Sequence, residues 1–259
     1  MPDLTVTLIQ TELEWEDAAS NLRRFDRLIG GLETATDLIV LPEMFTTGFS
    51  MNAAALAEEM SGRAVGWLQE SARRTGAAVV GSLIIAADGR YYNRLCWARP
   101  DGTLETYDKK HLFGYAGEDR TYTAGGSALL VELKGWKIRP FVCYDLRFPV
   151  WVRNGHLADY DLALFIANWP QKRAAHWKAL LPARAIENQC FVIGVNRIGS
   201  DGNGLCHSGD SSIIDPDGTV LFQNTHAPCV FTLTLERRRI DACRKEFPVL
   251  RDADQFALR

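Results

Sequence analysis

The sequence predicts an α/β protein in which two sheets pack face to face and helices cover the outside. Three observations indicate this class. A strand, a helix and a strand open the chain, hairpin turns follow in its first half, and strand-like runs outnumber helical ones throughout. A βαβ unit combined with hairpins gives mixed sheets, and many strands with few helices need a second sheet to bury them.

The opening unit begins with the strand-like run LTVTLIQ. Residues 16–34 then place apolar side chains at helical spacing on one face and charged side chains on the other. The run DLIVLPE has the composition of a buried strand, which Pro42 ends. We therefore expect a βαβ unit at the start of the chain.

A second helix is expected at residues 64–74, and β-rich segments follow it. Asp88-Gly89 and Pro100-Asp101-Gly102 separate these segments as hairpin turns do. A sheet that contains both this meander and the opening βαβ unit is mixed.

The second half of the chain continues the strand-rich pattern. A helical stretch is expected at residues 171–189, which Pro182 should interrupt or restart. The charged tail, residues 237–259, is predicted to be an extended arm of a single domain that spans residues 1–259. Further strands are expected in KIRPFVC, DLALFIANW, CFVIGVNRIG, SSIIDPDGTVLF and CVFTLTL.

Composition narrows the class of partner and compartment. The chain is 47% hydrophobic and 24% charged, as soluble globular proteins are, and its net charge of −3 offers no basic stripe for nucleic acid. We expect a small polar or anionic metabolite as the partner. The N-terminus lacks the pattern of a signal peptide, and no apolar run approaches the ~20 residues that span a bilayer, so a cytoplasmic protein is expected.

The six cysteines form no C-x-x-C pair, so neither a zinc site nor a redox dithiol is predicted. The histidines show no metal-ligand spacing either. We expect no metal and no cofactor. The segment GSDGNG, residues 199–204, lacks the order of a phosphate loop and is interpreted as a turn between strands.

Three polar residues stand at the ends of strand-like runs: Glu43, Lys109 and Cys143. Ligands collect at the carboxyl ends of strands in open sheets, so these side chains are predicted to converge on one pocket. On its own, Cys143 fits a small buried hydrophobe better than a nucleophile. Glu43 alone fits a cap, and Lys109 beside Lys110 alone fits a solvated basic pair, about as well as they fit a site.

Together, the three residue types can break an amide bond. An ammonium and a base within hydrogen-bond reach raise the thiolate fraction of a cysteine whose ordinary pKa is about 8.5. The ammonium and the backbone N–H of Tyr144 can stabilise the oxyanion that forms after attack. The glutamate that took the thiol proton can return it to the departing ammonia.

The segments LPEMF, YDKKHLF and CYDLRFP resemble the Glu, Lys and Cys motifs of the nitrilase superfamily, the carbon-nitrogen hydrolases, in the same order. Further segments that resemble the family extend the similarity over nearly the whole chain. The resemblance implies a four-layer α-β-β-α sandwich that associates as a homodimer or higher oligomer. It also implies that Lys109, two residues before His111, is the catalytic lysine, and that Glu118 in YAGED is a second glutamate that orients the lysine and the attacking water.

Details such as AGED, CYDLRFPVW and FPVLRDADQF look most like the omega-amidase subgroup, which hydrolyses the side-chain amide of 2-oxo acids such as 2-oxoglutaramate. Arg147 is a candidate clamp for the substrate carboxylate. It fits equally a partner of Asp145 or a cap of the helix that Pro149 begins.

Two further residues are expected at the substrate. Trp169 is a candidate wall of the pocket, although a tryptophan of the core fits its context as well. His111 is expected to hold the lysine loop by hydrogen bonds rather than to titrate.

The sequence thus predicts a thiol amidohydrolase that forms a cysteinyl thioester. A nitrilase or an N-carbamoyl amidohydrolase would use the same three residues. A binding module without turnover and a thiol redox sensor are the alternatives from other classes; the intact Glu43, Lys109 and Cys143 argue against the first, and the lack of a resolving-cysteine motif against the second.

Overall fold

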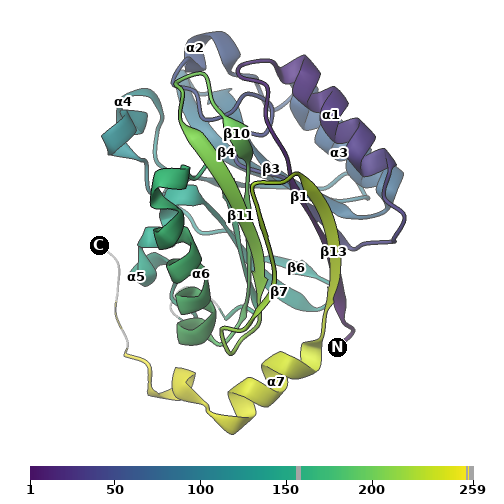
Figure 1. Ribbon diagram of the computed structural model, residues 1–259, viewed down its shortest axis with the longest axis vertical. Helices are drawn as coiled ribbons and strands as arrows, with labels where there is room; N and C mark the ends of the chain where they lie inside the picture. The colour runs from purple at the N-terminus through teal and green to yellow at the C-terminus, as the bar shows by residue number, and fades with distance from the viewer. Residues whose placement is uncertain (156–158, 255, 257–259) are drawn as a thin grey trace.

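A computed structural model describes residues 1–155, 159–254 and 256. Within this part of the chain, two sheets lie face to face and helices cover their outer faces (Figure 1). The layers follow one another as helix, sheet, sheet, helix. The predicted α-β-β-α sandwich is therefore confirmed. No helix in the described ranges is both long and apolar enough to cross a membrane.

The first sheet is mixed, as predicted. Its strand order over the described residues is β13-β1-β2-β3-β4-β5, with β1, β2 and β3 parallel and the remaining neighbours antiparallel. The last strand in the chain, β13, therefore lies beside the first. The strands are β1 (Leu4–Gln10), β2 (Leu38–Val40), β3 (Ala78–Ala87), β4 (Arg90–Ala98), β5 (Leu104–Asp108) and β13 (Cys229–Leu235).

The second sheet is mixed as well. Over the same described residues its order is β10-β11-β9-β8-β7-β6, with β12 beside β11, and β7, β8 and β9 run parallel. Its strands are β6 (Val131–Leu133), β7 (Trp136–Val142), β8 (Leu162–Ala167), β9 (Phe191–Asn196), β10 (Ile198–Ser200), β11 (Cys206–Ile214) and β12 (Val220–Thr225).

The long helices form the outer layers. α1 and α3 pack on the first sheet, and α6 packs on the second (Figure 1). Asp17 caps α1 by accepting the Ser20 N–H at 3.0 Å, as expected of an N-cap aspartate. The helices are α1 (Ala18–Gly30), α2 (Ala53–Leu56), α3 (Arg63–Thr75), α4 (Glu118–Thr121), α5 (Pro149–Val152), α6 (Ala174–Asn188) and α7 (Arg237–Glu246), with short 3₁₀ turns at Gly114–Ala116, Cys143–Arg147, Gln171–Arg173 and Val249–Asp252.

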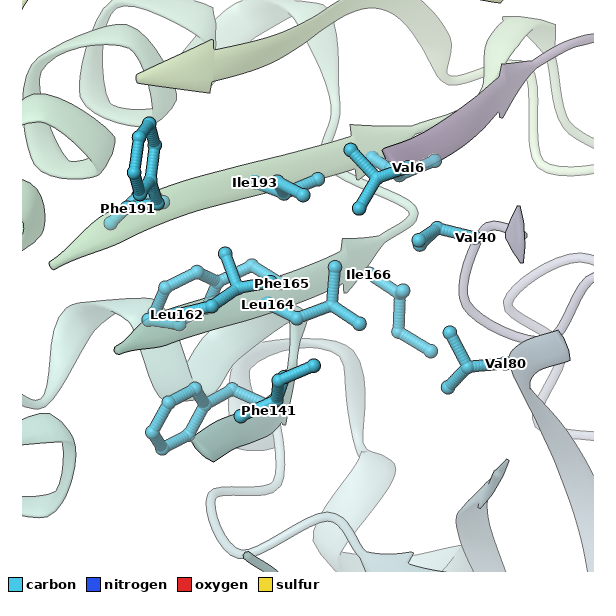
Figure 2. Packing of buried hydrophobic residues seen from close by; sticks show 14 of the residues in the cluster. Val6, Val40, Val80, Phe141, Leu162, Leu164, Phe165, Ile166, Phe191 and Ile193 are labelled. Carbon is cyan, nitrogen blue, oxygen red and sulfur yellow. The ribbon is translucent and has the colours of Figure 1, made fainter. Parts of the chain in front are cut away.

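The two-residue period of the strands divides the core into two layers. In β2, Leu38 and Val40 face the second sheet, whereas Ile39 faces α1 and α3. Figure 2 shows Val6, Val40 and Val80 of the first sheet against phenylalanines, leucines and isoleucines of the second. Burial of such a side chain contributes about 1.5–3 kcal/mol, so this interface holds the two sheets in a fixed relation.

Pro182 neither interrupts nor restarts a helix, contrary to the sequence prediction. It lies inside α6, which continues from Ala174 to Asn188. A proline there removes one backbone hydrogen bond. Trp177, Leu181 and Ala185 are fully buried on both sides of it, so packing keeps the helix in place.

The prediction of an extended C-terminal arm is wrong over its first part. Residues 237–246 form α7, and residues 255 and 257–259 lie outside the described residues. Arg237 and Arg244 pair with the buried Asp161 at 2.7 and 3.0 Å, and Ile240 joins the core. The spacing of Arg237, Ile240 and Arg244 places them on one face of the helix. This pattern is a weak signal in the sequence, because only one of the three residues is apolar.

The ends of three strands position the predicted site. Glu43 follows β2 of the first sheet, Lys109 follows β5 of the same sheet, and Cys143 follows β7 of the second. β2 and β7 belong to the parallel parts of their sheets, whose carboxyl ends are where α/β proteins place their ligands.

Candidate active site

The predicted residues converge. The Lys109 Nζ donates to Glu43 Oε1 at 2.9 Å and to the two carboxylate oxygens of Glu118 at 2.9 and 3.0 Å. All three side chains are at most 1% exposed. Cys143 lies close enough to Glu43 and Lys109 for both charged groups to shift the pKa of its thiol. Positions spread over a hundred residues of chain therefore form one cluster, which we call the catalytic floor: Glu43, Lys109, Glu118 and Cys143.

The floor holds two carboxylates and one ammonium, and their mutual interactions determine whether Lys109 and Glu118 are charged. Burial alone would lower the pKa of Lys109, but Glu118 and Glu43 outweigh it and raise that pKa. Burial raises the pKa of Glu118, Lys109 lowers it in part, and Glu43 raises it again. Lys109 is thus a permanent cation.

Cys143 rests as a thiol. Burial raises its pKa well above the ordinary value, Glu43 raises it further, and Lys109 lowers it only in part. The lysine lowers the pKa of the thiol as expected, but burial and Glu43 outweigh it, so the resting thiolate fraction is small. Activation needs transfer of the thiol proton to Glu43.

Glu43 is held in one orientation. Its Oε2 accepts the backbone N–H of Asn168 at 2.8 Å, and its Oε1 accepts the side-chain amide of Asn93 at 2.8 Å as well as the ammonium of Lys109. The side-chain amide of Asn168 donates to the Glu43 carbonyl at 2.5 Å. A base fixed by this many donors needs no rearrangement before proton transfer.

The sequence interpretation missed Asn93 and Asn168. Asn93 is fully buried in β4, and its amide also reaches Glu118 Oε1 at 3.3 Å, so it spans both carboxylates. A polar residue at an inward position of the strand ArgTyrTyrAsnArgLeu was the available signal. For Asn168 the signal was its place directly after β8, at the carboxyl end of a parallel strand.

Cys143 occupies a sharp turn between β7 and the 3₁₀ turn Cys143–Arg147. Its φ of 45° lies in the left-handed region, which non-glycine residues rarely adopt. Such strain persists where the surrounding structure enforces it, and it is typical of functional positions. Here it points to a nucleophile rather than to a cysteine of the core.

Asp145 ties the lysine loop to this turn. One carboxylate oxygen accepts the backbone N–H of His111 at 3.0 Å and lies 2.8 Å from its ring Nδ1. The other accepts the hydroxyl of Tyr107 at 2.8 Å and the N–H of Val142 at 3.0 Å. Fully buried and fully partnered, Asp145 fixes Lys109 relative to Cys143.

His111 holds the lysine loop, as predicted, and stacks on Phe148 with ring centroids 3.8 Å apart. It is not among the residues that line the cavity above the floor. Its prediction as a substrate-binding residue is therefore not supported, because its ring faces Asp145 and Phe148 instead.

A cavity of about 510 Å³ opens above the floor. Lys109 and Cys143 line its base, and the predicted Tyr144, Arg147 and Trp169 line its side. Glu43 and Glu118 lie behind the lysine and do not reach the open space. The volume suits a small metabolite.

Arg147 neither pairs with Asp145 nor caps the helix that Pro149 begins, the two structural roles considered for it. Its guanidinium lies 4.5 Å from the ring centre of Trp169, and its Nη2 lies 3.1 Å from His176 Nδ1. The oxygens of Asp145 are occupied by other donors, and Phe148 is the residue before the helix that Pro149 begins. Arg147 is thus a cation at the cavity.

A second cation of the cavity, Arg173, was not singled out from the sequence. Its guanidinium lies 5.1 Å from the ring centre of Phe113. We call Arg147, Arg173 and the aromatic residues Phe113, Tyr144 and Trp169 the arginine wall.

The segment 199–204 ends β10 and then forms the predicted turn before β11, and it also reaches the cavity. Asp201 and Asn203 line the rim, and Asp201 Oδ1 accepts the N–H groups of Asn203 and Leu205 at 2.9 Å. His207, just inside β11, also lines the cavity. Burial and the nearby Arg197 lower its pKa to about 4, so it is neutral at neutral pH.

Two of the other cysteines are core residues, as expected. Cys96 and Cys190 are fully buried, and burial raises the pKa of Cys96 to about 12. In the described ranges, no three His, Cys, Asp or Glu side chains are grouped so as to hold a metal ion.

Known proteins share both the sequence and the fold of this chain. The carbon-nitrogen hydrolase family model matches residues 5–245. The omega-amidase YafV of Escherichia coli K12 is 48% identical over 261 residues, covering 100% of both chains. The 2-oxoglutaramate amidase of Bacillus subtilis is 33% identical over 251 residues, covering 96% of each. A crystal structure of a Xanthomonas campestris CN-hydrolase superfamily protein, with an arsenic adduct in its active site, superposes with a TM-score of 0.98 at 46% identity, covering 100% of both chains.

Proposed function

The chain belongs to the carbon-nitrogen hydrolase family, and from this premise we propose that it hydrolyses the omega-amide of a small 2-oxo dicarboxylate through a thioester on Cys143. The relatives of the chain support thiol-dependent hydrolysis of amides. We propose in addition the substrate and the role of each residue. The observation that carries it is the Lys109 ammonium, held between Glu43 and Glu118 at the base of a cavity that Cys143 lines.

In the first half-reaction, Glu43 takes the proton of the Cys143 thiol, and the sulfur attacks the amide carbonyl carbon. The carbonyl oxygen becomes an anion, which Lys109 and the backbone N–H of Tyr144 stabilise. The protonated Glu43 then gives its proton to the amide nitrogen, the C–N bond breaks, and ammonia leaves. The acyl group remains on sulfur as a thioester.

In the second half-reaction, Glu43 takes a proton from water, and the resulting hydroxide attacks the thioester. The C–S bond breaks, the thiol is restored with the proton from Glu43, and the carboxylic acid leaves. Glu118 keeps Lys109 charged and orients it toward the oxyanion and the water. The second carboxylate is thus a positioning group, since Lys109 separates it from the open cavity.

The names of the relatives support the omega-amide substrate, as does the charge of the cavity. The YafV protein is an omega-amidase and the Bacillus relative a 2-oxoglutaramate amidase. Arg147 lines the cavity without an acidic partner in the described residues and is available to a substrate carboxylate.

Ammonia release from matched substrates tests the proposal. 2-Oxoglutaramate should be hydrolysed faster than the corresponding nitrile or an N-carbamoyl amine, and Cys143→Ala should release none. Mass spectrometry of the protein mixed with substrate should find an acyl group on Cys143. A faster rate with the nitrile or the carbamoyl compound would instead assign the chain to one of those activities, and the absence of any turnover would favour a binding module.

The assembly and location remain part of the proposal. We propose a homodimer or higher homo-oligomer in the cytoplasm. Light scattering of the purified chain measures the oligomeric state, and cell fractionation tests the cytoplasmic location.

A further inference from the structure

The arginine wall carries positive charge that no ion pair balances in the part of the chain that the structure describes. Arg147 and Arg173 both line the cavity and are half-buried, and neither forms an ion pair with any acid of the described chain. A guanidinium that lines a cavity without an acidic partner can bind the carboxylate of a ligand through its planar donor fork. The missing partner is the observation to be explained.

The two guanidinium groups are held around one aromatic residue. Arg147 lies over the face of Trp169 at 4.5 Å, and the indole N–H of Trp169 donates to the carbonyl of Arg173 at 2.8 Å. Arg173 in turn lies 5.1 Å from the ring centre of Phe113. An aromatic face holds a guanidinium by its plane and leaves the N–H groups at its edge free to donate.

The two cations repel each other. Burial lowers the pKa of Arg147, and among the charges around it Arg173 lowers that pKa further. Glu16 and Asp201, the acids that line the cavity, form no ion pair with either arginine, and their oxygens bind other donors. Glu16 accepts the hydroxyl of Ser50 at 2.5 Å, and Asp201 accepts the backbone N–H groups of its own turn.

We propose that Arg173, together with Arg147, forms a two-guanidinium site that binds the carboxylate at the far end of the amide substrate. Arg173 is then a specificity-determining residue, and the enzyme selects amides that carry an anionic group over neutral amides of the same length. This inference rests on the proposed function and names the residues that choose its substrate. A ligand of about five carbons can place its amide at Cys143 and its carboxylate at the wall of the same 510 Å³ cavity.

The test compares an anionic amide with its neutral counterpart in Arg173→Gln. Glutaramate and pentanamide differ by the carboxylate alone, and the readout is the ratio of their kcat/KM values. The ratio should fall about 10- to 100-fold in Arg173→Gln, since a hydrogen bond to a charged group contributes that much. The loss should come from a higher KM for glutaramate, because the carboxylate is bound equally in the ground and transition states.

Lys172→Gln is the matched control. It removes the same charge one residue earlier, and Lys172 is exposed and does not line the cavity. It should keep the wild-type ratio, whereas Arg173→Lys should recover part of the loss. If Arg173→Gln fails to fold, two measurements replace it: the ratio in Arg147→Gln, and the inhibition of wild type by glutarate compared with that by pentanoate, which lacks one carboxylate.

The outcomes separate this inference from the function on which it rests. An unchanged ratio in Arg173→Gln, which means equal losses for glutaramate and pentanamide, would overturn the two-guanidinium site while leaving the amidase intact. A wild-type enzyme that releases no ammonia from any amide would overturn the proposed function instead.

Discussion

The catalytic floor and the arginine wall face the same cavity, but they treat charge in opposite ways. In the floor, Lys109 is fully buried and bonded to two carboxylates, which Asn93 and Asn168 hold in turn. In the wall, Arg147 and Arg173 are half-buried and form no ion pair with an acid of the described residues. The floor is complete without a ligand, and the wall is not.

This difference separates chemistry from recognition. Groups that must act on developing charge are most effective when the protein has already oriented them, so that nothing reorganises during the reaction. A group that selects a substrate by its charge must keep that charge available. Experiments that disturb the floor should therefore change kcat and stability, and those that disturb the wall should change KM.

Lys109→Met is expected to give the largest effect. It leaves Glu43 and Glu118 buried without a cation, which costs about 3–5 kcal/mol of unfolding free energy, and it lowers kcat on the order of 10³-fold through loss of the oxyanion contact. Urea unfolding measures the loss of unfolding free energy, and ammonia release measures the loss of kcat. Lys110→Met is the control, since Lys110 does not line the cavity. Similar losses in both variants would contradict the assignment to Lys109.

The stability loss in Lys109→Met should depend on pH. Burial and Glu43 already raise the pKa of Glu118 above its ordinary 4.5, and loss of the lysine removes the main group that lowers it. A raised pKa in the folded state stabilises the protein below the unfolded-state pKa, and this contribution is lost as pH rises. The deficit relative to wild type should thus shrink as pH falls from 8 toward 5. A deficit that grows over this range would contradict the charge balance of the floor.

Glu43→Gln should lower kcat on the order of 10²-fold or more, because the variant lacks the base that carries out all four proton transfers of the cycle. The same variant should make Cys143 more reactive toward iodoacetamide. Glu43 raises the pKa of Cys143 and Lys109 lowers it, so removal of the carboxylate leaves the lysine effect. Each unit by which the pKa falls gives about tenfold more thiolate at neutral pH. Slower alkylation together with slower turnover would show that Glu43 is structural.

The sequence predicted the floor better than the wall, for a physical reason. Glu43, Lys109 and Cys143 stand at strand ends, where local sequence pattern and the geometry of sheets both apply. Glu118 came from the family resemblance alone. The structure brings all four together.

The wall depends on packing between segments that no local pattern connects. Phe113 comes from the loop after Lys109, Trp169 from the end of β8, and Arg173 from the 3₁₀ turn before α6. Arg173 in the sequence is one basic residue in a polar stretch, and its charge becomes informative only when the surrounding acids are known to be occupied. The same limit explains Asn93, whose buried partners come from other strands and loops.

The layers of the fold followed from strand and helix periods, whereas two local predictions failed where tertiary contacts prevailed. Pro182 is kept inside α6 by buried neighbours on both sides. α7 forms because Arg237 and Arg244 reach one buried aspartate, Asp161. Both outcomes depend on partners far away in the chain.

Asn93→Leu should have a smaller effect on the catalytic floor than the two preceding variants. The variant keeps the side-chain volume but removes the donor that spans Glu43 and Glu118, so kcat should fall about tenfold while KM changes little. Asn188→Leu is the control, a fully buried asparagine that binds Asn154 away from the cavity. It should lose stability but keep kcat. Equal kcat in the two variants would remove Asn93 from the positioning of the carboxylates.

Salt should give the smallest effect and distinguish the two regions without mutation. Half-buried charges are screened far more than buried ones, and the Debye length falls from about 14 Å to about 4 Å between 0.05 and 0.5 M salt. The KM for glutaramate should therefore rise a few-fold over this range, while the KM for pentanamide and the kcat for both stay nearly constant. Steady-state kinetics at several concentrations of sodium chloride measure this. If kcat fell with salt and the KM for glutaramate did not rise, the screened charges would belong to the floor. The assignment of chemistry to the floor and of substrate recognition to the wall would then be wrong.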